Sequence, residues 1–372
     1  MRVLFLQRQP CIRALKYAAA LRARHRGITL GFAYQGRTLT EWYGAGDDLF
    51  TRWWRLPRSA PSSRLAAIVE DFAPDLIHSH NLPDLLTVLA LEVSGGEVPV
   101  IHDVHDMQSL RRTPYEDGFD DPEDPLALEE AAVTGCDALV AVSQEMLDAI
   151  TERYGALRRS LLFANYALAG DVAPPLAPEP EDGRTLRVVY QGSLSVNGSH
   201  YDLRDAFASI VAAGMSLDVY PNRDAPEYRA LADRTPGMRL METLPPAELM
   251  RVLPGYDVGW AAFNPGLNDA HLDTALPNKA FEYLASGLPV VSGPHRALAG
   301  LVRREGVGVV VDDPGEAPAA LAAAGPERLR ARVAERRGAF TVEGHIDALV
   351  GLYRDVVSAS PVTAGRRVSG LE

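Results

Sequence analysis

The sequence predicts an α/β protein with two doubly wound parallel sheets. Short apolar runs that suit buried strands alternate with helical patterns along residues 3–166, and the alternation restarts at residue 186. Such alternation is typical of parallel sheets. Between the two series, residues 172–183 hold four prolines and no periodicity, which indicates a linker. The 372 residues exceed one typical domain and suit two.

The first series predicts a complete Rossmann-like domain at residues 1–170. Strands are expected at 3–6, 28–34, 75–80, 98–104, 138–142 and 160–166, with helices at about 10–25, 64–71, 82–93, 124–134 and 144–154. The helix at 10–25 is expected to carry Arg13 and Lys16 on its polar face. Ser143 is expected to cap the helix that begins at Gln144.

The second series predicts another Rossmann-like domain at residues 185–340, after a linker at 171–184. Strands are expected at 186–191, 217–220, 238–241, 258–263, 288–291 and 306–311, with helices at 202–213, 225–234 and 247–253. The Ala- and Arg-rich region 317–358 should be helical. Its last part, at 341–360, is expected to pack back towards the first domain.

Composition narrows the class of protein. Hydrophobic residues make up 47% and charged residues 23%, which is typical of a globular chain. No apolar run approaches the roughly 20 residues that cross a bilayer, and the first ten residues lack the features of a signal peptide. Cys11 and Cys136 give neither a disulfide framework nor a metal spacing. We therefore expect a cytoplasmic protein, with peripheral association at the inner membrane surface as an option.

Charge is unevenly distributed. The net charge of −12 argues against a nucleic-acid binder. Residues 1–64 nevertheless carry twelve Arg or Lys against three acids, and the segment 42–58 interleaves three tryptophans with arginines. Two alternatives remain open: either the tryptophans are core and the arginines solvated, or the segment meets a membrane surface or an anionic or aromatic acceptor.

The most informative stretch is 277–292, PNKAFEYLASGLPVVS. Pro277 suits a first helical turn, Gly287 ends the helix, and an apolar strand follows. The amides at such a helix start can hold a phosphate, and Lys279 adds a positive charge there. Glu282, one turn after Asn278, could grip a sugar hydroxyl. The alternative is an ordinary surface helix whose Lys279 and Glu282 form a solvated pair.

This stretch resembles the donor-site segment of retaining glycosyltransferases of family 4, which have the two-domain GT-B fold. The segments HSHNLPDLL, VIHDVHD, DALVAVSQEM and VVYQGSL precede it in the family's order. The resemblance implies two Rossmann-like domains facing a central cleft, and sugar transfer from a nucleotide-diphosphate sugar with retention. It implies that Glu282 holds the ribose, and that His105 lies against the donor sugar near the reacting carbon.

The sequence also departs from the family. A Glu eight positions before the one that matches Glu282 is typical, but Thr274 stands there, beside Asp273. The Arg that usually follows the glycine matching Gly192 is Ser193. The diphosphate is therefore expected to rely on Lys279, on the amides of the helix that begins with Pro277 and Asn278, and on Arg204 as a further candidate.

His105 is the candidate catalytic histidine because it follows a strand, where ligands of open α/β sheets collect. For any one of His78, His80, His102 and His105, a hydrogen bond in the core is the common alternative. A metal cluster built from these four is conceivable, but H-x-H at strand ends also arises without metal, and we expect none.

The sequence therefore predicts a metal-independent hexosyltransferase that requires no cofactor beyond its donor. Its acceptor is expected to be a small molecule or a lipid-linked molecule. Two alternatives remain: a non-catalytic GT-B protein that binds a nucleotide or a partner, suggested by Thr274 and Ser193, and a nucleotide-sugar epimerase of the same fold.

Overall fold

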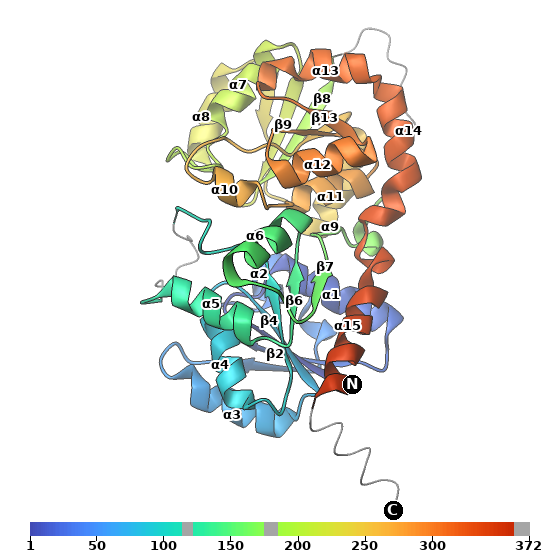
Figure 1. Ribbon diagram of the computed structural model, residues 1–372. Helices are drawn as coiled ribbons and strands as arrows, with labels where there is room; N and C mark the ends of the chain where they lie inside the picture. Colours follow the sequence, from blue (N-terminus) through green and yellow to red (C-terminus); the bar gives the residue numbers. More distant parts are fainter. Residues whose placement is uncertain (114–121, 175–184, 361–372) are drawn as a thin grey trace, which may run out of the picture. The chain divides into compact units, whose positions relative to one another are not determined.

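The computed structural model describes residues 1–113, 122–174 and 185–360 (Figure 1). The chain forms two compact units: Met1–Ala164 with the segment from His345 onward, and Asn165–Gly344. The expected linker at 171–184 lies mostly outside the described residues. The second unit begins before it, at Asn165, because Ala167 pairs with Thr341 in a parallel bridge.

The first unit contains a seven-stranded, fully parallel sheet in the order β3-β2-β1-β4-β5-β6-β7. Its strands are β1 (Arg2–Gln7), β2 (Thr29–Tyr34), β3 (Arg52–Arg55), β4 (Leu76–His80), β5 (Val100–Val104), β6 (Ala138–Ala141) and β7 (Ser160–Leu162). The central strands are buried on both faces, which explains their almost continuous apolar sequences.

Helices cover both faces of this sheet. They are α1 (Ile12–Arg24), α2 (Leu39–Tyr43), α3 (Pro61–Phe72), α4 (Leu85–Ser94), α5 (Pro125–Gly135), α6 (Gln144–Tyr154) and α15 (Ile346–Ala359), with a 3-10 turn η1 (Asp47–Leu49). Helices α3 to α6 follow one another side by side on one face, and α1 contacts α15 (Figure 1). The C-terminal helix α15 thus completes the first unit.

Two features of α1 and β3 differ from the sequence-based expectations. Arg13 and Lys16 were expected on a polar face, but both are buried, and Arg13 is only 3% exposed. The sequence predicts no strand in the segment 42–58, yet Arg52–Arg55 forms the edge strand β3. Its Trp54 is buried and its Trp53 stacks on Phe32 at 4.7 Å between ring centroids, so these two tryptophans belong to the core.

The second unit repeats the same topology with six parallel strands in the order β10-β9-β8-β11-β12-β13. They are β8 (Arg187–Gly192), β9 (Ser216–Pro221), β10 (Met238–Leu240), β11 (Val258–Trp260), β12 (Val290–Ser292) and β13 (Gly308–Val310). Trp260, Phe207 and Tyr190 are among the large side chains at the centre of this core.

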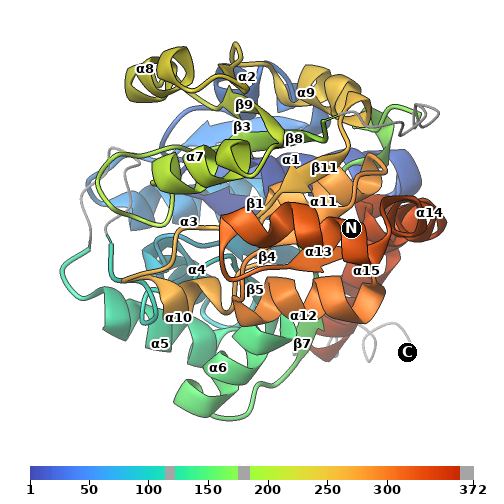
Figure 2. The ribbon, with the colours of Figure 1, turned by 90° about the horizontal axis from the view of Figure 1, so that it is seen from above.

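The helices of the second unit are α7 (Arg204–Ala212), α8 (Pro226–Arg234), α9 (Pro246–Val252), α10 (Asp269–Leu272), α11 (Asn278–Ala285), α12 (Arg296–Glu305), α13 (Ala317–Ala324) and α14 (Pro326–Arg336). Short 3-10 turns are η2 (Ala169–Asp171), η3 (Leu253–Gly255), η4 (Pro314–Glu316), η5 (Arg337–Phe340) and η6 (Val342–Gly344). Helix α7 packs on β9, α8 on β10, α11 on β11, and α12 and α13 on β13 (Figure 2).

In each sheet the chain order reverses between the first and fourth strands, that is, between β1 and β4 and between β8 and β11. Open α/β sheets bind ligands beyond the carboxyl ends of the strands at such a reversal. The predicted site residues gather at these two positions. Among the described residues, no helix combines the length and the apolar composition that crossing a bilayer requires.

Candidate functional site

Helix α11 is fastened to the sheet of the second unit by Tyr283. The Tyr283 ring lies where a side chain on Gly259 would be, since a Cβ there would come within 2.1 Å of the ring. A glycine in β11 therefore lets the helix approach closely. The Tyr283 hydroxyl accepts a 2.9 Å hydrogen bond from the backbone N–H of Gln191, in β8. These contacts set the position of α11 relative to the reversal between β8 and β11.

Lys279, in the first turn of α11, is buried rather than solvated, which excludes the alternative of an exposed Lys279–Glu282 pair. Its ammonium nitrogen lies 4.0 Å from the centroid of the Tyr190 ring and 5.1 Å from that of Phe263. Within the described part of the chain, this nitrogen has no hydrogen-bond acceptor. Burial lowers the pKa of Lys279 to about 7, although the charge of Glu282 opposes the shift.

The Lys279 ammonium is directed to the loop that follows β8. A Cβ placed on Gly192 would lie 3.6 Å from this nitrogen, so the cation sits directly beside the Gly192 backbone. Gly192 has a φ of +126°, a conformation that favours glycine. The structure thus brings two predicted site residues together, one from β8 and one from α11.

Glu282 lies on the same side of α11, one turn after Asn278. Its carboxylate accepts a 2.6 Å hydrogen bond from the side-chain amide of Gln191. Gln191 is itself held by the bond from its backbone to Tyr283, so its side chain orients the carboxylate. Glu282 is half-buried, which leaves part of it accessible to a ligand hydroxyl.

The other predicted donor-site residues surround this pair. Pro277 is the N-cap residue of α11, and Asn278 begins the helix. Ser193 follows Gly192: its carbonyl accepts a 2.6 Å bond from the Tyr190 hydroxyl, and its own hydroxyl accepts a 3.0 Å bond from Asn222. The loop after β8 is therefore fixed by hydrogen bonds from both Tyr190 and Asn222.

The residues at the positions that depart from the family have local structural partners. Thr274 is fully buried, and its hydroxyl donates a 2.8 Å bond to the His271 carbonyl. The carboxylate of Asp273 binds the backbone and side chain of Arg296 at the start of α12. Arg204 pairs with Asp202 at 2.7 Å, so its cation already has a carboxylate partner.

At the other reversal, in the first unit, Asp103 and Arg13 form a buried ion pair. The Asp103 carboxylate, near the C-terminal end of buried strand β5, accepts hydrogen bonds from the Arg13 guanidinium at 3.2 Å. Arg13 also donates to the carbonyl groups of Phe163 and Ala164. Burial alone would raise the pKa of Asp103, but the charge of Arg13 and the neighbouring His78, His105 and His80 together outweigh burial and hold that pKa well below its usual range.

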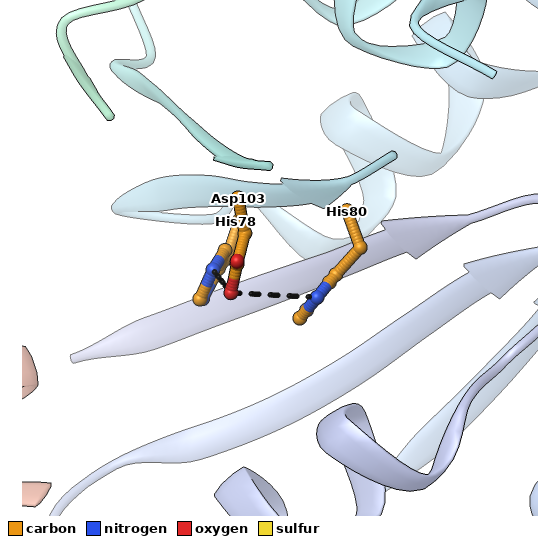
Figure 3. Close-up of side chains that lie close together, drawn as sticks. All are labelled: His78, His80 and Asp103. Carbon is orange, nitrogen blue, oxygen red and sulfur yellow. Dashed lines mark hydrogen bonds and ion pairs between the residues drawn. The ribbon is translucent and has the colours of Figure 1, made fainter. Parts of the chain in front are cut away.

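His78 and His80 flank the Asp103 carboxylate (Figure 3). One nitrogen of His78 lies 3.2 Å from Asp103, and the other forms a 2.6 Å hydrogen bond with the Tyr353 hydroxyl of α15. His80 stacks on His78 with ring centroids 4.4 Å apart. Burial lowers the pKa of both histidines, so both are neutral at neutral pH.

His78, His80 and Asp103 lie close enough together to be considered as metal ligands. Two of the three already have other partners, however: Asp103 is paired with the Arg13 guanidinium, and His78 with the Tyr353 hydroxyl. A metal ion would displace Arg13 and leave a buried guanidinium unpaired, which is costly. We therefore interpret the group as an ion-pair network and not as a metal centre.

His105 is the most accessible of the four candidate histidines, with 18% of its side chain exposed. Its Nε2 atom lies 3.3 Å from Nδ1 of His80 and 3.6 Å from Asp103. By contrast, His102 is fully buried and bonded to Thr87. His105 belongs to the first unit, whereas Lys279 and Glu282 belong to the second.

Several residues with a part in these sites were missed from the sequence. Each of them acts through a partner that is distant in the chain. Arg13 binds Asp103, 90 residues away, and Gln191 binds Glu282, 91 residues away. Tyr353 binds His78, 275 residues away. One signal existed: a carboxylate inside the apolar strand VIHDV needs a buried cation. No corresponding signal marks Gln191 or Tyr353.

Residues 14–161 match the family model Glycosyltransferase Family 4. Among solved structures, the sucrose-phosphate synthase of Thermosynechococcus elongatus has a TM-score of 0.71 at 17% identity, covering 96% of this chain and all of that one. HepE of Anabaena in complex with UDP and glucose has a TM-score of 0.68 at 15% identity, covering 95% and 99%. Comparison with curated protein sequences finds no match.

A proposed UDP-N-acetylglucosamine 2-epimerase of Listeria monocytogenes is also similar, with a TM-score of 0.58 at 12% identity over 93% of both chains. At these identities the likeness establishes the fold. The protein has the two-domain GT-B fold of glycosyltransferases, and its resemblance to family 4, first indicated by the motifs, is confirmed.

Proposed function

We propose that this protein transfers a sugar from a nucleotide-diphosphate sugar to an acceptor. The observation that carries the proposal is the Lys279 ammonium, which is buried beside Gly192 with no acceptor among the described residues. Burying an uncompensated cation is unfavourable unless a ligand completes its environment. A diphosphate at the carboxyl ends of β8 and β11 is a ligand of the right charge in the expected place.

The chemistry requires stabilisation of a leaving diphosphate. Negative charge accumulates on it as the glycosidic bond breaks, and Lys279 with the first amides of α11 is positioned to stabilise that charge. Because a lysine and a helix N-terminus supply the positive potential, we propose a metal-independent transfer.

The remaining roles follow the resemblance to family 4. Glu282, oriented by Gln191, is proposed to bind the ribose, while Gly192 and Ser193 approach the diphosphate through their backbone. Pro277 and Asn278 place the amides of α11. His105 is proposed to act beside the reacting carbon, with retention of configuration.

We propose a hexose as the transferred sugar. Uridine is the first base to test, because HepE was solved with UDP. The acceptor is proposed to be a small or lipid-linked molecule, and the protein to work in the cytoplasm, with at most peripheral contact with the inner membrane surface.

Two alternatives have specific support. The similarity to the epimerase structure favours an isomerisation of the nucleotide sugar, and Thr274 and Ser193 favour a GT-B protein that binds without catalysis. An epimerase changes the configuration of the sugar without an acceptor, which NMR of the nucleotide sugar detects. A transferase instead releases the nucleoside diphosphate.

The test is a thermal-shift and calorimetric titration of the full chain with UDP, GDP, ADP and dTDP. We expect one of them to raise the melting temperature, Lys279→Met to abolish the effect, and Arg251→Met, at an exposed position of α9, to retain it. A Lys279→Met variant that still binds would place the diphosphate elsewhere. No shift with any nucleotide would favour the non-catalytic alternative.

A further inference from the structure

Gln191 lies at the carboxyl end of β8 with its side-chain amide buried, and the residue is only 4% exposed. The side-chain nitrogen donates to the Glu282 carboxylate at 2.6 Å. The Oε1 atom of the same amide, by contrast, meets no hydrogen-bond donor in residues 1–113, 122–174 and 185–360. Nearly all buried polar groups of folded proteins are hydrogen-bonded, so this acceptor requires a specific explanation.

The orientation of this amide is set by its neighbours. A carboxylate only accepts hydrogen bonds, so turning the amide over would place the Gln191 oxygen against the Glu282 oxygen, two acceptors in contact. The backbone is fixed as well, because the Gln191 N–H donates to the Tyr283 hydroxyl at 2.9 Å and Gln191 pairs with Tyr220 of β9. The Oε1 atom is therefore held in place as an acceptor.

This acceptor is part of the same site as the Lys279 ammonium. Gly192, the next residue of β8, is the residue beside which that ammonium lies, 3.6 Å from where a Cβ would be. Glu282 follows Lys279 in α11 and contacts Gln191 directly. The site thus combines one cation with two neighbouring acceptors, the Glu282 carboxylate and the Gln191 oxygen. A ligand that satisfies all three carries an anionic group and two adjacent hydrogen-bond donors.

A nucleoside diphosphate carries these groups in the required order. Its ribose bears neighbouring 2′- and 3′-hydroxyl groups and is joined to the diphosphate through a single methylene group. Hydroxyl groups donate to carboxylate and amide oxygens alike. The N–H groups of the base are donors too, but the whole ribose separates them from the diphosphate. With the diphosphate at Lys279, the ribose is the part of the nucleotide that reaches Gln191 and Glu282.

We propose that the Gln191 oxygen accepts a hydrogen bond from one ribose hydroxyl while Glu282 accepts one from the other, which makes the protein selective for ribonucleotides over deoxyribonucleotides. The inference rests on the proposed function, because it needs the diphosphate at Lys279. Gln191 is then a binding residue in its own right, in addition to orienting Glu282.

The selectivity follows from what a missing hydroxyl leaves behind. A deoxyribonucleotide covers the Gln191 oxygen without bonding to it, so the acceptor stays buried and unpaired. A site built to bond a hydroxyl rejects the analogue that lacks it for this reason. Since hydrogen bonds to charged groups are the stronger ones, the hydroxyl at Glu282 should contribute more than the hydroxyl at Gln191.

The first experiment is calorimetric titration of the full chain with UDP, 2′-deoxy-UDP and 3′-deoxy-UDP, or with the same three forms of whichever base binds best. We expect the ribonucleotide to bind about tenfold tighter than either analogue, and dTDP to bind no better than 2′-deoxy-UDP. Equal affinities for all three forms would overturn this inference and leave the proposed function standing. Failure of every nucleotide to bind would refute both.

The second experiment separates a direct contact from mere orientation of Glu282. Gln191→Met keeps the length of the side chain and removes the acceptor. One of the two deoxy analogues should then bind this variant as tightly as UDP does, while the other should still bind about tenfold more weakly. If Gln191 only orients Glu282, the preference for both hydroxyls should fall together, which would contradict the proposal.

Gln144 provides the matched control. Its side-chain nitrogen donates to the Asp148 carboxylate at 2.7 Å, the same kind of bond, but at an exposed position of α6 in the first unit. Gln144→Met should leave all three affinities unchanged, and an equal loss in both variants would overturn the assignment to Gln191. Because the comparison of UDP with its analogues uses the unmodified chain, it decides the question even where Gln191→Met is poorly folded.

Discussion

The ammonium nitrogen of Lys279 lies 4.0 Å from the centre of the Tyr190 ring. Lys279 is in the first turn of α11, the helix that Tyr283 holds against Gly259. Lysine is also rare in this chain, since Lys16 is the only other one. The two aromatic rings stabilise the ammonium and hold it ready to bind an anion. While no anion is bound, burying this charge destabilises the folded protein. The following two predictions test both sides of this relationship.

Donor binding should weaken above neutral pH. The pKa of Lys279 is lowered to about 7 by burial, so the free protein loses the ammonium as the pH rises through 7. The value of kcat/KM for the donor reports ionisations of the free enzyme. We expect it to fall by about tenfold per pH unit between pH 7.5 and 9, as measured in initial-rate assays.

Lys279→Arg is the matched variant, because arginine stays protonated throughout this range. It should bind the donor less well at pH 7, owing to its larger head group, but without the decline at higher pH. A wild-type profile that stays flat to pH 9 would show that Lys279 does not titrate as its burial indicates.

Lys279→Met should stabilise the free protein while abolishing donor binding. The folded-state pKa near 7 lies below the unfolded value near 10.5. The wild type thus gains stability as the pH rises between these values, because only the unfolded chain still holds the proton. The excess in free energy of unfolding of Lys279→Met over the wild type should be largest at pH 6. It should shrink by at most about 1.4 kcal/mol per pH unit above pH 7. Urea unfolding at pH 6 and 9 measures it, and an equal or greater advantage at pH 9 would refute it.

Glu282→Ala should raise the KM for the donor with little change in kcat, because a ribose contact is equally strong in the ground and transition states. Loss of hydrogen bonds to a charged group costs about 1.5–3 kcal/mol, which corresponds to about ten- to hundredfold. Gln191→Leu should act in the same direction but less, since it leaves the carboxylate that Gln191 orients in the site. A collapse of kcat at unchanged KM would assign Glu282 to the chemical step instead.

Asp103→Asn should destabilise the first unit strongly. The substitution leaves the Arg13 guanidinium buried without its counter-ion, a change that costs about 3–5 kcal/mol in comparable pairs. Asp71→Asn is the control: Asp71 pairs with Arg52 at 2.6 Å, but both side chains are 51% exposed. Its cost should stay below about 1 kcal/mol. Urea denaturation compares the two, and similar losses would mean that the buried pair adds nothing specific.

Weak binding to anionic vesicles should occur at low salt and disappear as salt is added. The first 64 residues are strongly basic, and Trp42, 52% exposed, lies under the Arg37 guanidinium at 5.2 Å. Basic residues near an anionic surface contribute about 1 kcal/mol each, screened by salt. Co-sedimentation measures this, and Trp42→Ala should reduce it. Equal recovery with neutral vesicles, or none at low salt, would leave a soluble acceptor.

Strand β3 shows where prediction from the sequence failed. It spans four residues at the sheet edge, and its adjacent Trp53 and Trp54 are flanked by Arg52 and Arg55. Adjacent apolar residues between charges match neither a strand nor a helix period. Only pairing with β2 defines this segment, and that pairing joins residues about 20 positions apart.

Helix α1 shows that the sequence also failed to predict which charged side chains are buried. Its sequence suits a helix, but Arg13 and Lys16 were expected on the solvent side, because a helical pattern cannot show which charges have buried partners. Arg13 is buried because Asp103 meets it from β5, 90 residues further along the chain. The distribution of apolar residues therefore predicted helix α1 correctly but predicted an exposed Arg13 where the structure has a buried one.

The sequence by itself determined the two parallel sheets, the start of α11 at residues 277–278 and the order of the motifs, because these depend on local periodicity and on residues adjacent in the chain. Only the tertiary structure decided that the Lys279 ammonium is buried over Tyr190 and beside Gly192. The pKa of Lys279 is lowered because residues of β8, some 90 positions earlier in the chain, come within about 4 Å of the ammonium and exclude water from it. The spacing of neighbouring residues in the sequence cannot show this desolvation.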